Sequence, residues 1–257
     1  MDLGLKRRRA VVTGASRGIG RAIASALAAE GADVIAAARN AEKLQGLAGS
    51  VQPGTGTITP HVADMSKEAD IQGLAGELGK ADILVFNTGG PPFGTASEIT
   101  DAAWIGQFEA MFLSAIRLTR LALPGMRARK YGRIMLVVSS GVIQPIPNLA
   151  LSNALRSGLV GWAKTLASEV AADGVTVNCL APGRISTDRI VEFDQARAKR
   201  EGTTEEQARK ASLVTIPAGR YGEADEFAAM AAFLASPKAS YMTGGIIRID
   251  GGMIRSV

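Results

Sequence analysis

The sequence predicts an α/β protein with a doubly wound (Rossmann) parallel sheet of about seven strands and helices on both faces. Longer helix-prone segments alternate with seven short apolar runs: RRAVVT, ADVIAAA, TITPHV, DILVFN, GRIMLVVS, VTVNCLAP and GIIRIDG. Strands that are apolar on both faces are typical of a parallel sheet covered by helices on each side. A glycine-rich segment follows the first run, at the position where doubly wound folds bind a dinucleotide.

Helix signals fall between the apolar runs. A glycine after the last periodic residue ends a helix, and Gly31 supplies such a stop. The expected helices cover residues 16–29, 41–48, 67–78, 101–129 and 151–172.

The stretch 188–216 interrupts the alternation with polar, charged and helix-prone sequence. It falls where open α/β folds place loops beyond the carboxyl ends of the strands, next to bound ligands. A substrate lid and a solvated pair of surface helices both explain it. No linker or internal repeat divides the chain, so we expect residues 1–257 to form a single domain.

Composition limits the classes of partner. The 257 residues are 47% hydrophobic with a net charge of +5, and the basic cluster at residues 6–9 is interpreted as a solvated edge rather than a nucleic-acid patch. No apolar run of about 18 residues and no N-terminal signal is present, so a cytoplasmic protein without a membrane partner is expected. One histidine, His61, and one cysteine, Cys179, make a metal site implausible, and the apolar neighbours of Cys179 predict a buried thiol.

The glycine-rich segment runs from Thr13 to Gly20 with the spacing G-x-x-x-G-x-G. Glycine permits a tight turn and close backbone approach, and the exposed N–H groups at a helix start accept phosphate. Many strand-to-helix turns need glycine for geometry alone. Here the turn lies between the first strand and the first helix, which is the context that nucleotide binding requires.

This turn and three later motifs resemble the short-chain dehydrogenase/reductase family, in particular the 3-oxoacyl-ACP reductases, and the resemblance covers essentially the whole chain. The later motifs are Asp64-Met65, Asn87-Thr88-Gly89 and the segment PGRIST at 182–187. The resemblance implies that they contact the adenine, the adenosine ribose and the nicotinamide carboxamide, respectively. The cofactor-binding residues implied are Gly14, Ser16, Arg17, Gly18, Ile19, Gly20, Arg39, Asp64, Asn87, Gly89, Arg156, Pro182, Gly183, Ile185 and Thr187.

The end of the second strand indicates which dinucleotide is used. Relatives that use NAD carry an acid there, which bonds the ribose 2′-hydroxyl, whereas this chain has Ala38 followed by Arg39. Arg39 and Arg17 could hold a 2′-phosphate through charge-assisted hydrogen bonds. We therefore expect NADP as cofactor, with NADPH preferred over NADH, although Arg39 could also merely cap the loop in solvent.

The catalytic positions depart from the family pattern. The family uses Tyr-x-x-x-Lys, a serine and an asparagine, and the ungapped alignment of the following helix places Ser152 at the tyrosine and Arg156 at the lysine. The serine falls at Ser139 or Ser140, of which we choose Ser140, and Met111 stands at the asparagine and is interpreted as helix packing. Arg156 can place positive charge near an oxyanion, but it cannot act as a general acid.

Slow reduction could still proceed if the protein orients the substrate and cofactor and if Ser140 and Arg156 stabilise the carbonyl oxygen. The proton would then come from the substrate or from water near Ser152. In the competing interpretation, Ser152 and Arg156 face the solvent and have no catalytic role. Two proline-containing loops, 91–93 and 144–147, would give an apolar mouth suited to an uncharged or acyl-type carbonyl substrate, or they are simply stiff.

The predicted function is that of an oxidoreductase that transfers a hydride between NADP(H) and a ketone or secondary alcohol through a divergent catalytic site. The first alternative is a catalytically impaired nucleotide-binding protein, acting as a sensor or assembly partner. The second is a lyase or isomerase that uses the same pocket. The resemblance also implies a homo-oligomer, a tetramer or a dimer.

Overall fold

A computed structural model describes residues 1–256, and within them one seven-stranded sheet has the order β3-β2-β1-β4-β5-β6-β7. All neighbouring strands are parallel. The strands are β1 (Arg9–Thr13), β2 (Asp33–Ala38), β3 (Thr57–Val62), β4 (Ile83–Phe86), β5 (Gly132–Val137), β6 (Val175–Pro182) and β7 (Ile246–Ile249). The predicted doubly wound fold is confirmed, with each strand inside its predicted apolar run.

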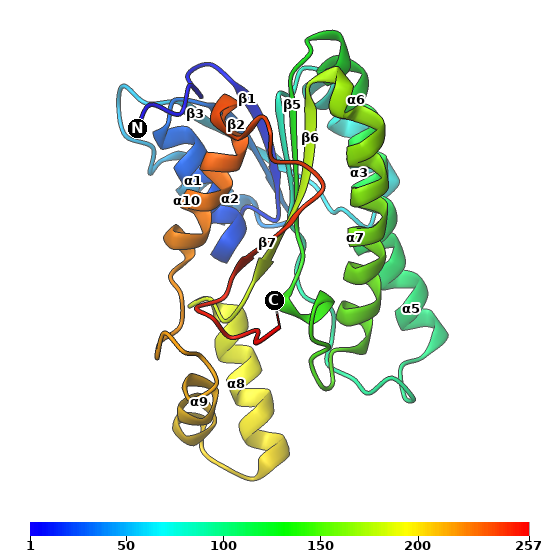
Figure 1. Ribbon diagram of the computed structural model, residues 1–257, viewed down its shortest axis with the longest axis vertical. Coiled ribbons are helices and arrows are strands. Elements are labelled where there is room, and N and C mark those ends of the chain that lie inside the picture. The colour runs from blue at the N-terminus through cyan, green and yellow to red at the C-terminus, as the bar shows by residue number, and fades with distance from the viewer. Residues whose placement is uncertain (257) are drawn as a thin grey trace.

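Helices cover both faces of the sheet, as Figure 1 shows. One face carries α1 (Gly18–Ala29), α2 (Ala41–Ala48) and α10 (Ala224–Ala235), and their buried residues form one core cluster with that face of the strands. The other face carries α3 (Glu68–Gly73), α4 (Ala75–Leu78), α6 (Ser114–Ala128) and α7 (Ala150–Val170), which form a second cluster. Residues of the central strands alternate between the two clusters, as in any sheet that is buried on both sides.

Three predicted helices differ from those observed. The first begins at Gly18 instead of 16, because Arg17 is extended (φ −157°). The helix expected over 67–78 is divided between α3 and α4 at Leu74. The helix expected over 101–129 consists of α5 (Asp101–Phe108), a π-helical turn η1 (Glu109–Leu113) and α6. The Ser114 hydroxyl donates to the Ala110 carbonyl at 2.6 Å, a local bond that competes with regular helix geometry.

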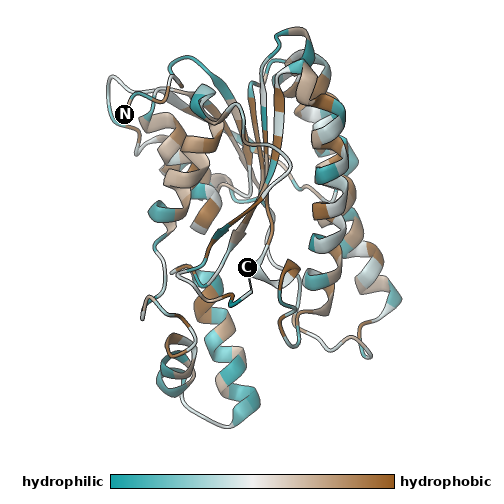
Figure 2. Cartoon of the chain, in the orientation of Figure 1, coloured by the Kyte–Doolittle hydropathy of each residue, from teal (hydrophilic) through white to brown (hydrophobic). Residues whose placement is uncertain are grey.

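The stretch 188–216 folds into α8 (Asp188–Glu201) and α9 (Glu205–Leu213), which project beyond the carboxyl end of the sheet (Figure 1). Figure 2 shows that both helices combine hydrophilic with hydrophobic residues. A buried polar cluster holds the pair together: the Asp194 carboxylate accepts from the Tyr221 hydroxyl at 2.6 Å and from the Ser212 hydroxyl at 3.1 Å. The pair is therefore a packed unit and not a loose surface loop.

Short 3-10 turns complete the chain at η2 (Ser140–Val142), η3 (Ala171–Asp173) and η4 (Pro237–Ala239). Cys179 lies in β6 with 2% of its surface exposed, as predicted, and burial raises the pKa of its thiol to about 12. No helix within residues 1–256 is both long enough and apolar enough to cross a membrane.

Candidate functional site

The glycine-rich turn lies at the point where the strand order reverses, between β1 and β4. The carboxyl ends of these adjacent parallel strands bring Thr13 and Asn87 together. The Thr13 hydroxyl donates to the Asn87 carbonyl at 2.9 Å and accepts from the Asn87 amide N–H at 3.0 Å. The Asn87 side chain donates to the Gly14 carbonyl at 3.3 Å. Doubly wound folds bind their ligands at this switch point, so the geometry matches a dinucleotide site.

Two glycines of the turn are required by close backbone approach. A Cβ on Gly14 would lie 2.5 Å from the Asn87 carbonyl oxygen, and one on Gly20 would lie 2.3 Å from the Gly14 oxygen. No side chain caps the start of α1, and its first turn carries no acid. Its leading N–H groups therefore remain available for an anion. A hollow of about 460 Å³ opens beside them, lined in part by Ser16 and Thr187.

The residues expected to hold adenosine lie together at the ends of β2, β3 and β4. Asp64 accepts from the amide N–H and the hydroxyl of Ser66, bonds that lower the pKa of its carboxyl, with a smaller contribution from the nearby charge of Arg39. Beside Asn87, the Thr88 hydroxyl is buried and has no hydrogen-bond partner among residues 1–256. A polar ligand could satisfy this unpaired group. The uncapped helix, the glycine cradle and this hydroxyl together fit a dinucleotide.

The segment from Pro182 to Thr187 returns to the same site from β6. Residue 185 pairs with Gly222 in an isolated parallel bridge, and a Cβ on Gly183 would lie 2.6 Å from the Asp250 Cα. The Thr187 methyl lies 3.3 Å from the position of a Gly18 Cβ. The structure therefore brings this segment against the glycine-rich turn, although the two are 160 residues or more apart in sequence.

Ser152 and Arg156 lie in the buried part of α7, each 6% exposed. The interpretation of these residues as a surface-facing pair is therefore wrong. They occupy one face of the helix because they are one turn apart, and that face packs against the carboxyl end of β5. The Arg156 guanidinium donates to the Val137 carbonyl. Burial, followed by the like charge of Arg189, lowers the pKa of Arg156 to about 10, so the side chain is a cation at neutral pH.

The two serines after β5 differ in exposure. Ser139 is half-buried, and its hydroxyl accepts from the Gly141 amide N–H at 3.0 Å, which leaves the hydroxyl proton free to donate. Ser140 begins η2 and is 3% exposed. Asn153, which the sequence analysis missed, accepts from the Ile146 N–H at 3.2 Å and donates to the Ile146 carbonyl at 2.9 Å. It thereby fixes the loop that follows the serines.

Met111 is 1% exposed and packs with Leu151 and Leu155, in agreement with its interpretation as helix packing. The three tyrosines have other environments. The Tyr131 hydroxyl donates to the Ala235 carbonyl, Tyr221 donates to the carboxylate described above in α8, and Tyr241 is fully exposed. None of these tyrosines takes the family's position in α7.

The two proline-containing loops lie side by side. The Gly94 amide N–H donates to the Asn148 carbonyl at 2.9 Å, and Gly94 pairs with Leu149 in a second isolated bridge. Phe93 of the first loop meets Phe193 of α8, with ring centroids 5.9 Å apart. This aromatic contact joins the first loop to α8, and an apolar mouth between these elements stays a prediction.

Arginines flank this aromatic pair, a feature that the sequence analysis did not anticipate. Arg189 lies over the Phe93 ring at 4.6 Å and donates to the Pro91 carbonyl at 2.9 Å. Arg184 lies over the Phe193 ring at 4.4 Å, and its Nε is buried without a hydrogen-bond partner.

Charged residues of α8 also reach the glycine-rich turn. Arg17 pairs with Asp188 at 3.3 Å and with Glu192 at 3.4 Å, all three at least two-fifths exposed. Glu192 pairs in addition with Arg189 at 3.1 Å. Among residues 1–256, no group of three or more His, Cys, Asp or Glu side chains is placed to hold a metal ion.

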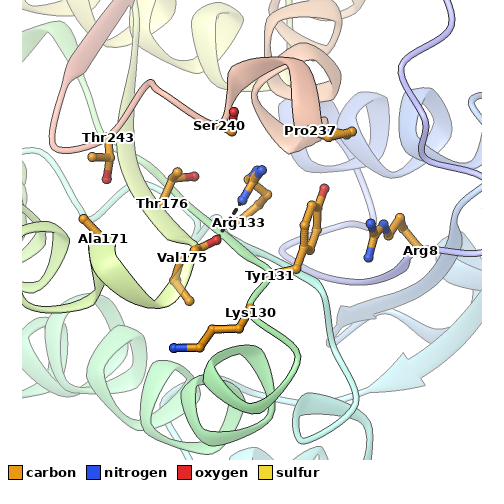
Figure 3. Close-up of a pocket in the computed structure, with 11 residues that line it drawn as sticks. Arg8, Lys130, Tyr131, Arg133, Ala171, Val175, Thr176, Pro237, Ser240 and Thr243 are labelled. Atoms are coloured by element: carbon orange, nitrogen blue, oxygen red, sulfur yellow. Dashed lines mark hydrogen bonds between the residues drawn. The ribbon is translucent and has the colours of Figure 1, made fainter.

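A separate hollow lies at the opposite, amino end of the strands (Figure 3). The Tyr131 ring lies between Arg8 at 3.7 Å and Arg133 at 4.2 Å. The Arg133 guanidinium donates to the carbonyls of Gly132, Gly174 and Ser236. These bonds join the start of β5 to the turn after α10, so the cluster serves the fold.

Comparisons with known proteins agree with this site. Residues 14–254 match the family model described as enoyl-(acyl carrier protein) reductase. The 3-oxoacyl-[acyl-carrier-protein] reductase FabG of Escherichia coli is 38% identical over 249 residues, covering 95% of this chain and 96% of that one. The chain belongs to the short-chain dehydrogenase/reductase family.

Two solved structures of this family superpose closely. L-sorbose reductase from Gluconobacter frateurii, complexed with NADPH and L-sorbose, matches with a TM-score of 0.93 and 32% identity over the full length of both chains. YwfH, an NADPH-dependent reductase involved in bacilysin biosynthesis, matches with a TM-score of 0.92 and 30% identity, covering 98% of this chain and 100% of that one.

Proposed function

We propose that the protein is an NADP-dependent short-chain reductase that reduces the carbonyl of a ketone, or oxidises the corresponding secondary alcohol. Family membership over nearly the whole chain supports the reaction class, and the NADPH of the superposed reductases supports the cofactor. The observation that carries the proposal for this chain is the buried cation Arg156, held beside the carboxyl end of β5.

The cofactor-binding residues would have four tasks. The turn from Gly14 to Gly20 would hold the pyrophosphate on its N–H groups, and Arg17 with Arg39 would bind the 2′-phosphate. Asp64, Asn87 and Gly89 would line the adenosine. The segment containing Pro182, Gly183, Ile185 and Thr187 would position the nicotinamide. NADPH, when bound, supplies the hydride, and the protein supplies position and electrostatic field.

The divergent polar set would replace the missing tyrosine in part. Negative charge develops on the carbonyl oxygen during reduction, and the Arg156 guanidinium would stabilise it at short range in a low-dielectric site. A hydroxyl from Ser139 or Ser140 would donate a hydrogen bond to the same oxygen. The proton that completes the alcohol would come from water near Ser152. Positioned general acid catalysis typically contributes 10²–10⁴ in rate, so turnover is expected to be slow.

The segment 188–216 is proposed to act as the substrate lid. α8 supplies Phe193 and Arg189 to the mouth, and the buried Asp194 cluster makes it a rigid cover. The chain is also proposed to form a homo-oligomer through β7 and the long helices. Exposed apolar side chains on these elements support this, including Ile246 on β7 and Ile105 and Phe108 on α5.

Two measurements test the proposal. NADPH fluorescence titration measures cofactor binding, and NADPH consumption across a panel of ketones measures chemistry. Binding together with slow consumption is expected. Tight binding without consumption of any substrate would favour a sensor or an assembly partner instead.

The double variant Ser152→Tyr, Arg156→Lys restores the family's catalytic pair. It is expected to gain about 10²–10⁴ in rate if the missing acid limits turnover. An unchanged rate in a variant that still binds NADPH would mean that the pocket performs another task, such as the lyase or isomerase chemistry considered above.

A further inference from the structure

The site holds buried positive charge as well as apolar side chains. Arg156 is 6% exposed, and its one hydrogen bond within residues 1–256 goes to a neutral carbonyl, that of Val137. The one charged side chain that shifts the pKa of Arg156 is Arg189, another cation. A buried charge is ordinarily paired, because desolvation without a counter-charge costs free energy. Among residues 1–256, Arg156 therefore has a second cation in its surroundings and no ion-pair partner, an arrangement that favours an anionic ligand nearby.

Two contacts with the loop after β4 hold Arg189 in place. Its Nη2 donates to the Pro91 carbonyl at 2.9 Å, and its guanidinium lies 4.6 Å from the Phe93 ring centroid. A Cβ on Gly90 would lie 2.7 Å from the same guanidinium, so this glycine leaves the space that the arginine occupies. The present counter-ion of Arg189 is Glu192 at 3.1 Å, but that carboxylate is 43% exposed and shared with Arg17. An incoming anion can therefore replace it.

The aromatic pair Phe93 and Phe193 indicates which chemical group the anionic ligand carries beside its charge. Phe93 and Phe193 pack against each other from two elements, the loop after β4 and α8. They offer an apolar surface directly beside Arg189. A ligand that fits both features has an apolar body with an oxyanion at one end.

We propose that the substrate is an oxo acid with an apolar body, and that Arg189 binds its carboxylate. Guanidinium groups match a planar carboxylate through paired N–H donors, which favours this anion. The inference rests on the proposed reductase function and names its substrate class. It replaces the uncharged carbonyl compound that the apolar loops alone suggested.

Binding is tested first, without turnover. Benzoate serves as the anionic probe and benzamide as its neutral counterpart, each added to the complex of the full chain with NADP⁺ in a thermal-shift titration. Benzoate is expected to raise the melting temperature and benzamide to leave it unchanged. Arg189→Met is expected to weaken benzoate binding roughly 10- to 100-fold, the effect of losing one hydrogen bond to a charged group. Arg200→Met makes the same charge change on an exposed part of α8 and is the matched control.

A kinetic assay tests the role of Arg189 in turnover. We compare kcat/KM for the acid benzoylformate with kcat/KM for its ester, methyl benzoylformate. Arg189→Met is expected to lower the ratio of acid to ester at least tenfold, whereas Arg200→Met leaves it unchanged. Equal use of acid and ester by the unmodified protein, or equal effects of benzoate and benzamide, overturns the inference. So does a loss of NADPH affinity in Arg189→Met that equals the loss for benzoate, because Arg189 would then hold the cofactor.

The outcomes separate the two proposals. Benzoate binding that depends on Arg189, without reduction of any ketone, supports the carboxylate site and contradicts the reductase function. Reduction of the ester without a preference for the acid supports the reductase and contradicts the carboxylate site.

Discussion

Replacing Arg156 by methionine is expected to lower activity without destabilising the fold. Burial lowers the pKa of Arg156 to about 10, which corresponds to a cost of roughly 3 kcal/mol for holding the charge in the folded protein. The hydrogen bond to the Val137 carbonyl offsets about 1.5–3 kcal/mol of that cost. Methionine fills a similar volume with a flexible apolar chain. The free energy of unfolding should therefore stay the same or rise by up to about 2 kcal/mol.

Two assays measure the consequences. The melting temperature should be unchanged or raised by up to roughly 8 °C, at about 2–4 °C per kcal/mol for a chain of this size. The value of kcat for ketone reduction, followed by NADPH absorbance, should fall roughly 10²–10³-fold, as when an oxyanion-stabilising donor is removed. Arg120→Met, which removes an exposed charge from α6, is the control and should change neither quantity.

The pH dependence of stability tests whether burial of the Arg156 charge destabilises the fold. The pKa of Arg156 is lower in the folded than in the unfolded protein, so the cost of burying the charge is constant below about pH 10 and is relieved as pH rises through that value. The difference in melting temperature between the variant and the unmodified protein should therefore be flat from about pH 6 to 9. A fall of more than about 10 °C in the variant, with kcat retained, would refute the reasoning and make Arg156 a structural residue.

Two further predictions concern the cofactor and the serines. Arg39→Asp should weaken NADPH binding at least tenfold and leave NADH binding nearly unchanged, because an acid would repel the 2′-phosphate. Fluorescence titration measures the affinity for both nucleotides. Lys80→Asp, at an exposed position, is the matched control. Equal losses for the two nucleotides would contradict a role at the phosphate. Ser139→Ala should lower kcat more than Ser140→Ala, because the Ser139 hydroxyl is the more accessible and keeps its proton free while accepting from Gly141. The opposite order would assign the carbonyl contact to Ser140.

The strands and the dinucleotide motifs could be predicted from sequence because their causes are local. Each strand is a continuous apolar run, and the turn at Gly14 needs glycine for a contact with Asn87 that the adjacent strand ends make inevitable. The π-helical turn at Glu109–Leu113 was not predictable, because it lies within a continuous helical pattern that does not distinguish it from an α-helix.

The charge arrangement of the site depends on long-range packing, which is why the sequence did not reveal it. Arg189 meets Phe93 only because α8 packs over a loop almost a hundred residues earlier in the chain. Because serine and arginine are polar, the sequence was equally compatible with Ser152 and Arg156 on the protein surface or inside a pocket. Burial of that face of α7 against β5 decides between them.

One carboxylate links the two ends of the proposed site. Glu192 lies 3.4 Å from Arg17 through one oxygen and 3.1 Å from Arg189 through the other, so it competes with the cofactor phosphates for one cation and with the proposed substrate carboxylate for the other. Exposed pairs of this kind contribute about 0.2–1 kcal/mol each.

Glu192→Gln should therefore tighten the binding of both NADPH and benzoate by roughly 1.5- to 5-fold. Asp188→Asn is the matched variant, since Asp188 pairs with Arg17 alone and should affect NADPH but not benzoate. Weaker binding of both ligands in Glu192→Gln would show the reverse, that Glu192 holds α8 in the geometry that binds them. The two variants thus distinguish a competing counter-ion from a positioning residue, because only competition predicts a gain in affinity. Of the two carboxylates, Glu192 is the one that pairs with both Arg17 and Arg189.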